Sequence, residues 1–587
     1  MSLAVLAPAL HAQDLDLVMP ESVPKLVEPE APIAQTAIDE QAALFEAMRQ
    51  EFLGASGEET VILPELKGII LLKDEAQVNT VALSPAASSN LADYPDWDSA
   101  DFRGLVDAFV GLPVSKESVD RLQSALRIQL SMLGRPFSIV YSPPQDITDG
   151  YLQFVIKESV TGEIRVEGSE HFSDKSYLSR IKQQAGQPID AIVLRQGIDR
   201  INSNSFRSAA AQVQPGVEPG TTDIIIQARD RFPLRVFAGY NNTGTETTTH
   251  DRMFTGFNWG NAFGLGHIMT LQWTSDFDVE HSKALSGNYT ADLWNNHSVT
   301  VFGAYSEIVS VPNGGIEQEG TSWQLGLNYD IPLQPIGQRY THRVQLGFDY
   351  KSSDNNLEIA IPPFVIPISD NLTHVVQFRG KYSGTLTDSW GATSLGLQVT
   401  MSPGGLASEN DDDAFDASRA FANADYIYGN LDIFRNNNLR GFLEGWNWTL
   451  RGEWQVANGN LLGSEQFSGG GSQSVRGYEE SEVVGDNALF FSQELQLPVM
   501  QPAVDLFDGK FRDSLRLFAF HDYARTWNVD KLAGEEPFNV QSIGAGLNYQ
   551  FSTYASLRFA YGWQLKDSGT SSTGDNSRAH VSFQISY

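Results

Sequence analysis

Beyond residue 233, apolar and polar residues alternate along the chain, as they do in half-buried β-strands. The alternation is clearest near the C-terminus, where apolar residues occupy every second position: Ile543, Ala545, Leu547, Tyr549 and Phe551, then Val581, Phe583, Ile585 and Tyr587. The residues between them are small or polar. Because successive side chains of a strand point to opposite faces, one face of this predicted sheet meets an apolar medium and the other meets water.

Turn residues divide this region into sixteen predicted strands. They lie near 234–243, 250–260, 267–277, 282–293, 297–308, 320–332, 340–352, 370–386, 389–402, 421–434, 442–457, 484–499, 513–526, 539–551, 554–566 and 577–587. The series predicts an antiparallel transmembrane β-barrel of about 16 strands, in which lipid-facing and lumen-facing residues alternate. A soluble β-sandwich is the alternative, and it would need a second sheet to bury the apolar faces.

The strand predicted at 442–457 shows what the two faces carry. Trp446, Trp448 and Trp454 share one face, which suits lipid or an interfacial girdle of aromatic residues. The alternate positions are expected to line the lumen: Thr449, Arg451, Glu453 and Gln455.

Upstream of the predicted barrel, the order strand, helix, helix, strand, strand occurs twice. The first unit, 61–160, has strands near 61–72, 137–141 and 150–158 and helices near 101–110 and 115–133; the second, 161–230, has strands near 162–168, 206–213 and 222–229 and helices near 173–184 and 190–203. This recurrence predicts two small α+β domains. The barrel domain follows as 231–587 and contains a long loop at about 458–483.

A strand edge is the part of such a domain that can bind another chain. Its unpaired N–H and C=O groups can add an extended peptide as a further strand, and the flanking helix then supplies side-chain selectivity. We take the edge of the second domain, with its helix at 190–203, as the preferred binding surface. Three residues represent this region: Asp190, Leu194 and Ile198. The alternative is that both domains are spacers.

The amino-acid composition argues against several classes of binding partner and catalytic site. The 40 basic and 72 acidic residues give a net charge of −32, which opposes binding to nucleic acid. The chain has no cysteine, which excludes disulfides, thiolate nucleophiles and zinc-thiolate sites. It has no run of about 18 apolar residues, which excludes a helical membrane span. Hydrolase, phosphate-binding and zinc-peptidase motifs are also missing, so we expect no enzyme activity, no cofactor and no metal.

A glycine-rich loop, Gly469 to Tyr478, interrupts the series of strands. Its three consecutive glycines allow the backbone to fold back tightly. Gly477 follows Arg476, so a guanidinium can be presented at a sharp tip. The alternative is a flexible surface hairpin with one solvated arginine.

Two motifs together carry a resemblance to a known family. The loop motif is Val475, Arg476, Gly477 and Tyr478, and the motif on the strand at 513–526 is Phe520 and Asp522. The combination resembles the outer-membrane translocators and insertases that join POTRA domains to a barrel. Within that superfamily, the chain is similar to the outer-membrane transporters of two-partner secretion, the haemolysin secretion/activation family.

The resemblance implies how the two motifs meet. In that family the loop folds back into the lumen, and its arginine pairs with the strand aspartate, which here would be Arg476 and Asp522. Glu494, on the lumen face of the preceding strand, offers a second acceptor. His521 falls on the outer face and is expected to be interfacial or structural. Ala524 stands where the family pattern usually has glycine.

The resemblance also implies a function. The chain is expected to lie in the bacterial outer membrane with its N-terminal domains in the periplasm. It would bind an unfolded, large β-helical partner protein through those domains and export it through the lumen without ATP. The other expected partners are outer-membrane lipids and the barrel-assembly machinery, which reads a terminal aromatic residue such as Tyr587, and we expect a monomer. The alternatives are an insertase for other barrels and, from a different class, a passive diffusion porin.

The first 60 residues are expected to lie outside these domains. Residues 1–12 resemble the apolar core and small-residue end of a secretory signal peptide, without its usual basic start. Residues 13–60 form a tail with a predicted helix at 36–53, which in the resembled family can plug the pore. The linker 54–60 spans at most roughly 24 Å when extended. We therefore expect the helix to pack on the next domain.

Overall fold

The computed structural model describes residues 61–79, 89–91, 93–97, 100–293, 296–310, 316–336, 339–361, 364–502, 513–569 and 576–587. These residues form two compact units, with the main boundary between Phe232 and Pro233. The expected signal segment 1–12 and the tail 13–60, with its helix at 36–53, lie outside the described residues.

The first α+β domain contains a four-stranded sheet and two α-helices. Its elements are β1 (Val61–Leu63), β2 (Gly68–Leu72), β3 (Ser89–Asn90), α2 (Ala100–Asp107), β4 (Val114–Ser115), α3 (Lys116–Met132), β5 (Ile139–Tyr141) and β6 (Tyr151–Lys157). The sheet has the order β3-β2-β6-β5, and β1 pairs with β4. α3 begins at a reciprocal cap, because Ser115 and Ser118 each accept the other's main-chain N–H. Its apolar stripe, which includes Leu122, Leu126 and Leu130, is buried in the core.

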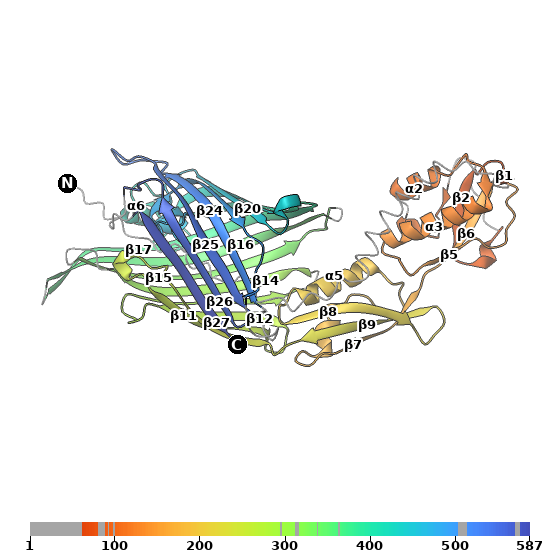
Figure 1. The fold of residues 1–587 in the computed structure, drawn as a ribbon, viewed down its shortest axis with the longest axis horizontal. Coiled ribbons are helices and arrows are strands. Elements are labelled where there is room, and N and C mark those ends of the chain that lie inside the picture. Colours follow the sequence, from red (N-terminus) through yellow and green to blue (C-terminus); the bar gives the residue numbers. More distant parts are fainter. Residues whose placement is uncertain are drawn as a thin grey trace. The chain divides into compact units, whose positions relative to one another are not determined.

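The second domain has the simpler order strand, helix, helix, strand, strand. It consists of β7 (Val160–Glu167), α4 (Asp174–Leu178), α5 (Ala191–Asn202), β8 (Arg207–Pro215) and β9 (Thr221–Asp230). The sheet has the order β7-β9-β8, and α5 lies along β8 (Figure 1). Asp190 starts α5 by accepting the N–H groups of Ile192 and Val193. The predicted order of strand, helix, helix, strand, strand is therefore present in the second domain, and in the first domain the short strands β3 and β4 are added before and after α2. The helix predicted at 173–184 is shorter and ends at Leu178.

From Pro233 onward the chain forms a closed antiparallel barrel of 16 strands, as the sequence predicts (Figure 1). The strands are β10 (Leu234–Asn241), β11 (Arg252–Ala262), β12 (His267–Ser275), β13 (Ser282–Asp292), β14 (Ser298–Ser310), β15 (Ile316–Pro332), β16 (Tyr340–Ile361), β17 (Phe364–Asp388), β18 (Gly391–Pro403), β19 (Asp425–Asn438), β20 (Asn447–Ala457), β23 (Asn487–Gln496), β24 (Asp513–Trp527), β25 (Phe538–Phe551), β26 (Ala555–Gln564) and β27 (Ser577–Ser586). β10 pairs with β27 and so closes the wall. This closure excludes the β-sandwich alternative.

One hairpin is longer than predicted. β16 and β17 pair from Tyr340 and Leu386 up to Ile361 and Phe364, with one register shift after Leu357, whereas the sequence pattern marks strands only at 340–352 and 370–386. The residues from 352 to 356 are all polar, so the alternation that marks a membrane-facing strand is absent there. Main-chain hydrogen bonds extend a hairpin without requiring that alternation.

The two faces of the barrel wall follow the predicted alternation. Exposed residues of the outer face include Trp448, Trp454, Ile543, Phe583 and Ile585. Inward-facing Gln455 and Ser542 are buried. Among the described residues, none of the helices combines the length and the hydropathy needed to cross a bilayer.

Candidate functional site: a loop held inside the barrel

The loop between β20 and β23, residues 458–486, folds into the barrel. Two short strands within it, β21 (Phe467–Gly469) and β22 (Val483–Gly485), pair as a hairpin. Val475 and Tyr478, near its tip, have no exposed surface. They pack with inward-facing residues of β23, β24 and β25: Phe490, Ala524 and Val540. The loop predicted at 458–483 therefore lies against the inner wall.

Arg476 makes the central contact between the loop and the wall. Its Nε donates to Asp522 Oδ2 at 2.8 Å and its Nη2 donates to Asp522 Oδ1 at 2.9 Å, a bidentate pair. Its Nη1 donates to Glu494 Oε2 at 2.7 Å, and its main-chain N–H donates to Asp522 Oδ2 at 3.1 Å. Ser492 Oγ donates to Asp522 Oδ1 at 2.6 Å. The contacts predicted for Arg476 with Asp522 and Glu494 are thus present in the structure.

The environment of Arg476 keeps the guanidinium charged. Its side chain is 5% exposed and that of Asp522 is 0% exposed. Burial alone would lower the pKa of Arg476, but the hydrogen bonds and charges of Asp522 and Glu494 outweigh burial and raise this pKa above its ordinary value. The cluster therefore behaves as a desolvated ion pair rather than as a surface salt bridge.

Two phenylalanine rings form a shelf beneath the guanidinium. The Arg476 Cζ lies 3.6 Å from the centroid of the Phe520 ring and 5.7 Å from that of Phe518. Both rings lie over glycines of the neighbouring strand, since a Cβ at Gly544 would fall 2.3 Å from Phe520 Cζ and one at Gly546 would fall 2.4 Å from Phe518 Cζ. The sequence pattern places these glycines on the lumen face, but it does not show that the absence of their side chains leaves space for the two phenylalanine rings.

The remaining residues of the loop motif fix the tip to other strands. Gly477 donates its N–H to His580 Nε2 at 2.9 Å and accepts from Gln564 Nε2 at 2.8 Å. The Tyr478 hydroxyl oxygen lies 2.8 Å from the Gln541 carbonyl oxygen and 2.5 Å from that of Lys566, so its single proton can be donated to either. The motif thus connects the loop to the wall through side chain and main chain alike.

Ala524, at the position where the family pattern usually has glycine, is fully buried beneath the loop. Its methyl group belongs to the apolar cluster that includes Phe467 and Val483 of the loop hairpin. The departure from the family pattern therefore adds a contact with the loop.

A second set of ion pairs, which no local sequence pattern indicates, holds the base of the loop. Lys351 Nζ donates to Glu465 Oε1 at 2.7 Å, and the Tyr428 hydroxyl donates to Glu465 Oε2 at 2.9 Å. Arg419 binds Asp486 through two bonds of 2.7 and 3.1 Å. Burial would raise the pKa of Glu465, but the charge and hydrogen bond of Lys351 lower it below its ordinary value. Only the fold brings these residues together, because Lys351 and Glu465 are far apart in sequence.

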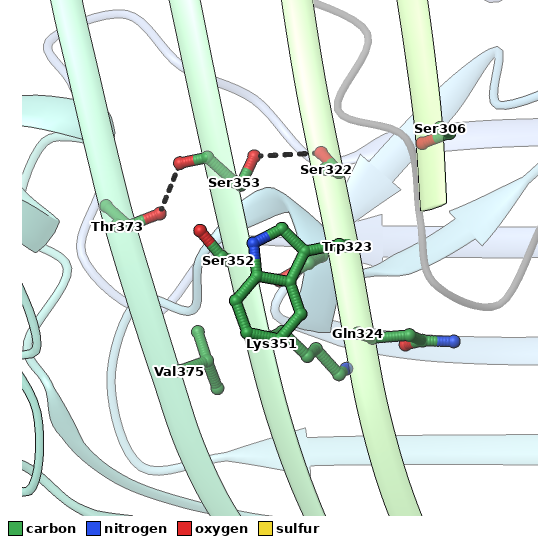
Figure 2. A pocket seen from close by; sticks show the side chains of 10 residues that line it. Ser306, Ser322, Trp323, Gln324, Lys351, Ser352, Ser353, Thr373 and Val375 are labelled. Carbon is green, nitrogen blue, oxygen red and sulfur yellow. Dashed lines mark hydrogen bonds between the residues drawn. The ribbon is translucent and has the colours of Figure 1, made fainter. Parts of the chain in front are cut away.

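Figure 2 shows the wall beside this contact, where hydroxyl groups of neighbouring strands surround a small pocket. Ser322 Oγ donates to Ser353 Oγ at 3.3 Å, and Thr373 Oγ1 donates to the Ser353 carbonyl at 3.5 Å. Lys351 and the loop residue Ser464 also line the pocket. This part of the lumen wall is therefore polar, as expected for a water-filled barrel.

Comparison with known proteins shows which family has this architecture. Residues 220–549, more than half of the chain, match the profile of the family described as "Haemolysin secretion/activation protein ShlB/FhaC/HecB". The chain belongs to this family. The outer membrane transporter CdiB-2 of Burkholderia pseudomallei is 20% identical over 440 residues, which cover 72% of this chain and 70% of the relative. The heme/hemopexin transporter protein HuxB of Haemophilus influenzae is 21% identical over 426 residues, covering 69% and 70%.

Solved structures share the fold. CdiB from Escherichia coli matches with a TM-score of 0.73 at 17% identity, over 94% of this chain and 97% of that one. CdiB from Acinetobacter baumannii matches with a TM-score of 0.65 at 16% identity, over 94% and 98%.

As a two-partner secretion transporter, the chain lies in the outer membrane with its N-terminal region in the periplasm. The second α+β domain leads directly into β10, so the end of the barrel near Leu234 is the periplasmic end. In the antiparallel series β20 runs in the same direction as β10, away from the periplasmic end. The loop 458–486 follows β20 and therefore enters the lumen of this transporter from the extracellular side.

The prediction that Asp190, Leu194 and Ile198 contact the client requires a correction. Leu194 and Ile198 are 6% and 4% exposed and pack in the core of the second domain, so their side chains are not available to a client. They occupy the inner stripe of α5, which the helical period could not distinguish from an exposed apolar stripe. Asp190 is engaged as the cap of α5 and forms an ion pair with Arg135 at 2.9 Å.

Proposed function

We propose that this transporter binds an unfolded, large β-helical partner protein in the periplasm and conducts it through the barrel lumen to the cell surface without ATP. The observation that carries the proposal is the loop 458–486, which occupies a polar lumen and is held there by discrete ion pairs. Such contacts can be broken and remade, so the path can be closed at rest and open during export. The proposal assigns no catalytic step, cofactor or metal to the chain.

The edge of β8 is the surface that we propose for capture of the partner. β8 is an edge strand of its sheet within the described residues. The main chain of Ala209 points away from β9, because its N–H and C=O bond the Asn202 side chain at 2.6 and 3.1 Å. By the two-residue period, the main-chain groups of Ala211 and Val213 face the same side. An extended client can pair with them as an added strand.

A proline substitution tests this edge. Ala211→Pro removes one outward N–H while leaving the ladder between β8 and β9 intact, because proline is tolerated on an edge strand. We expect this variant to lose binding and secretion of the partner, whereas Ala211→Val, which keeps the N–H, retains both. Equal secretion by the two variants would rule out strand addition at β8. Loss of the 161–230 domain without loss of binding would rule out the whole domain as the capture site.

The export function itself is tested by deleting the gene. Loss of one large secreted protein encoded beside it supports two-partner secretion. Broad loss of outer-membrane barrels would instead support an insertase, and neither loss would support a diffusion porin. We further propose that the transporter works as a monomer among outer-membrane lipids. We also propose that the barrel-assembly machinery reads Tyr587, which is 94% exposed, during biogenesis.

A further inference from the structure

The closure between the first and last strands is incomplete at its extracellular end. β10 and β27 are in register from Phe237 and Ser586 to Asn241 and Ser582. β27 continues beyond this point and pairs with β26 as far as Trp563 and Ser577. One further main-chain bond joins the Asn242 N–H to the Val581 carbonyl at 3.3 Å. In the part of the chain that the structure describes, residues 577–580 therefore have a strand on one side only.

Side chains take over where the strand pairing stops. Asn242, directly after β10, donates from Nδ2 to the Ala579 carbonyl at 2.7 Å and accepts the Val581 N–H at 2.8 Å. Its amide thus imitates a peptide group of a neighbouring strand. Closer to the extracellular end of β27, Arg578 Nη2 donates to the Gly244 carbonyl at 3.3 Å.

A carboxylate from the lumenal loop lies at this same place. Glu479 Oε1 accepts the main-chain N–H of Glu246 at 2.7 Å and lies 3.0 Å from His250 Nε2, both in the hairpin that joins β10 to β11. The same oxygen accepts from Arg578 Nη1 of β27 at 3.4 Å. The Glu479 and Arg578 side chains are 18% and 17% exposed, so the contact is largely shielded from water.

We propose that Glu479 is a positioning residue that fastens the first hairpin of the barrel to its last strand. It thereby couples the position of the lumenal loop to the closure of the barrel wall. The loop tip is also tied to β27 by the bond from Gly477 to His580, so withdrawing the tip pulls Glu479 away from both sides of the junction. This inference goes beyond export, because it concerns how the wall is held and can be tested without a client.

Hydrogen exchange of the full-length protein in detergent or bilayers tests the coupling. In Glu479→Ala we expect peptides from 234–242 and 577–587 to exchange at least about tenfold faster, the factor that corresponds to losing a charge-assisted hydrogen bond. Peptides from β18, whose main contacts are with β17 and β19 on another part of the wall, should not change. The matched control is Ser468→Ala, since the Ser468 hydroxyl donates to Ser481 Oγ at 2.9 Å within the loop.

A disulfide across the junction separates wall closure from loop structure. Asn241 and Ser582 are paired across β10 and β27. Residues directly opposite each other in antiparallel strands have Cα atoms about 4.5–5.5 Å apart, which suits a disulfide. The chain contains no natural cysteine. Oxidised Asn241→Cys/Ser582→Cys should return the exchange of Glu479→Ala to within about twofold of the parent. The proposal is overturned if Glu479→Ala leaves these peptides unchanged or accelerates all strands alike. It is also overturned if Ser468→Ala has the same effect, or if the disulfide restores nothing.

Discussion

Gly477 at the loop tip and Gly562 of β26 touch through their main chains, with no space for a side chain at either position. A Cβ at Gly562 would lie 2.7 Å from the Gly477 Cα, and a Cβ at Gly477 would lie 2.9 Å from the Gly562 carbonyl carbon. Gly477 also has a φ of 95°, which L side chains rarely adopt. Main-chain atoms cannot yield as the end of a flexible side chain can, so this contact requires glycine on both sides.

Gly562→Ala should therefore displace the loop tip while leaving the barrel folded. We expect a higher single-channel conductance in planar bilayers, because the loop no longer lies flat against β26. Gly452→Ala on β20 is the matched control, since the nearest atom to a Cβ there is the Phe490 carbonyl oxygen at 3.9 Å. An unchanged conductance in Gly562→Ala would show that the tip accommodates the methyl group.

Breaking the central ion pair should impair secretion without preventing membrane insertion. Arg476→Ala leaves the buried Asp522 without its cation, at a cost of about 3–5 kcal/mol. Asp522→Ala removes the bidentate pair but leaves Arg476 its bond to Glu494. Because each single substitution already removes the contact, the double substitution should be little worse than either. Secretion of the partner and heat-dependent electrophoretic mobility of the barrel measure the two effects. Fully additive losses would mean that the residues act separately.

Cross-linking gives a second measure of the same contact. With Arg476→Cys and Asp522→Cys in one chain, oxidation should join the loop to β24 and block secretion, and reduction should restore it. The chain contains no other cysteine to compete. A pair that never cross-links in membranes would place the loop tip elsewhere.

The base of the loop should be as sensitive to a stranded charge as the tip. Glu465 has a side chain only 1% exposed, so Lys351→Met leaves a buried carboxylate without its cation. We expect a lower unfolding temperature of the barrel, and recovery of most of the loss in the double variant Lys351→Met/Glu465→Gln. If the single and double variants unfold at the same temperature, the ion pair contributes little to the stability of the barrel.

The second α+β domain should lose stability in acid through Asp230. Burial would raise the pKa of this carboxyl, but the N–H of His171 and the hydroxyl of Tyr177 donate to it and hold the pKa below its ordinary value. The unfolded chain thus binds the proton more readily. The stabilisation is full above the ordinary carboxyl pKa of about 3.9 and is lost as the pH falls through the lower folded value.

Amide exchange of peptides from 169–178, corrected for the intrinsic rate, measures this loss between pH 6 and pH 3, with α3 of the first domain as the internal control. Asp230→Asn should exchange faster at neutral pH and show a weaker dependence on acid. The assignment to Asp230 fails if the variant and the parent follow the same pH profile.

Much of the architecture could be predicted from the sequence, because it depends on periods along the chain. Alternation at every second residue marked the sixteen strands and placed Asp522 and Glu494 on the lumen face. It also placed His521 on the outer face, where its ring now lies 2.8 Å from Gln541 Nε2. Local periodicity failed where side chains do not alternate, as in the outer part of the β16–β17 hairpin. It also could not tell that Leu194 and Ile198 face a core.

The strand series, the α+β domains and the loop motif follow from the amino-acid sequence, since each arises from neighbours along the chain. Which distant groups meet depends on the folded barrel. It brought Lys351 to Glu465, the ring of Phe520 over Gly544, and Glu479 to both Glu246 and Arg578. The physical reason is that closing a barrel around a folded-in loop sets distances between residues far apart in the chain, and no one-dimensional period encodes those distances.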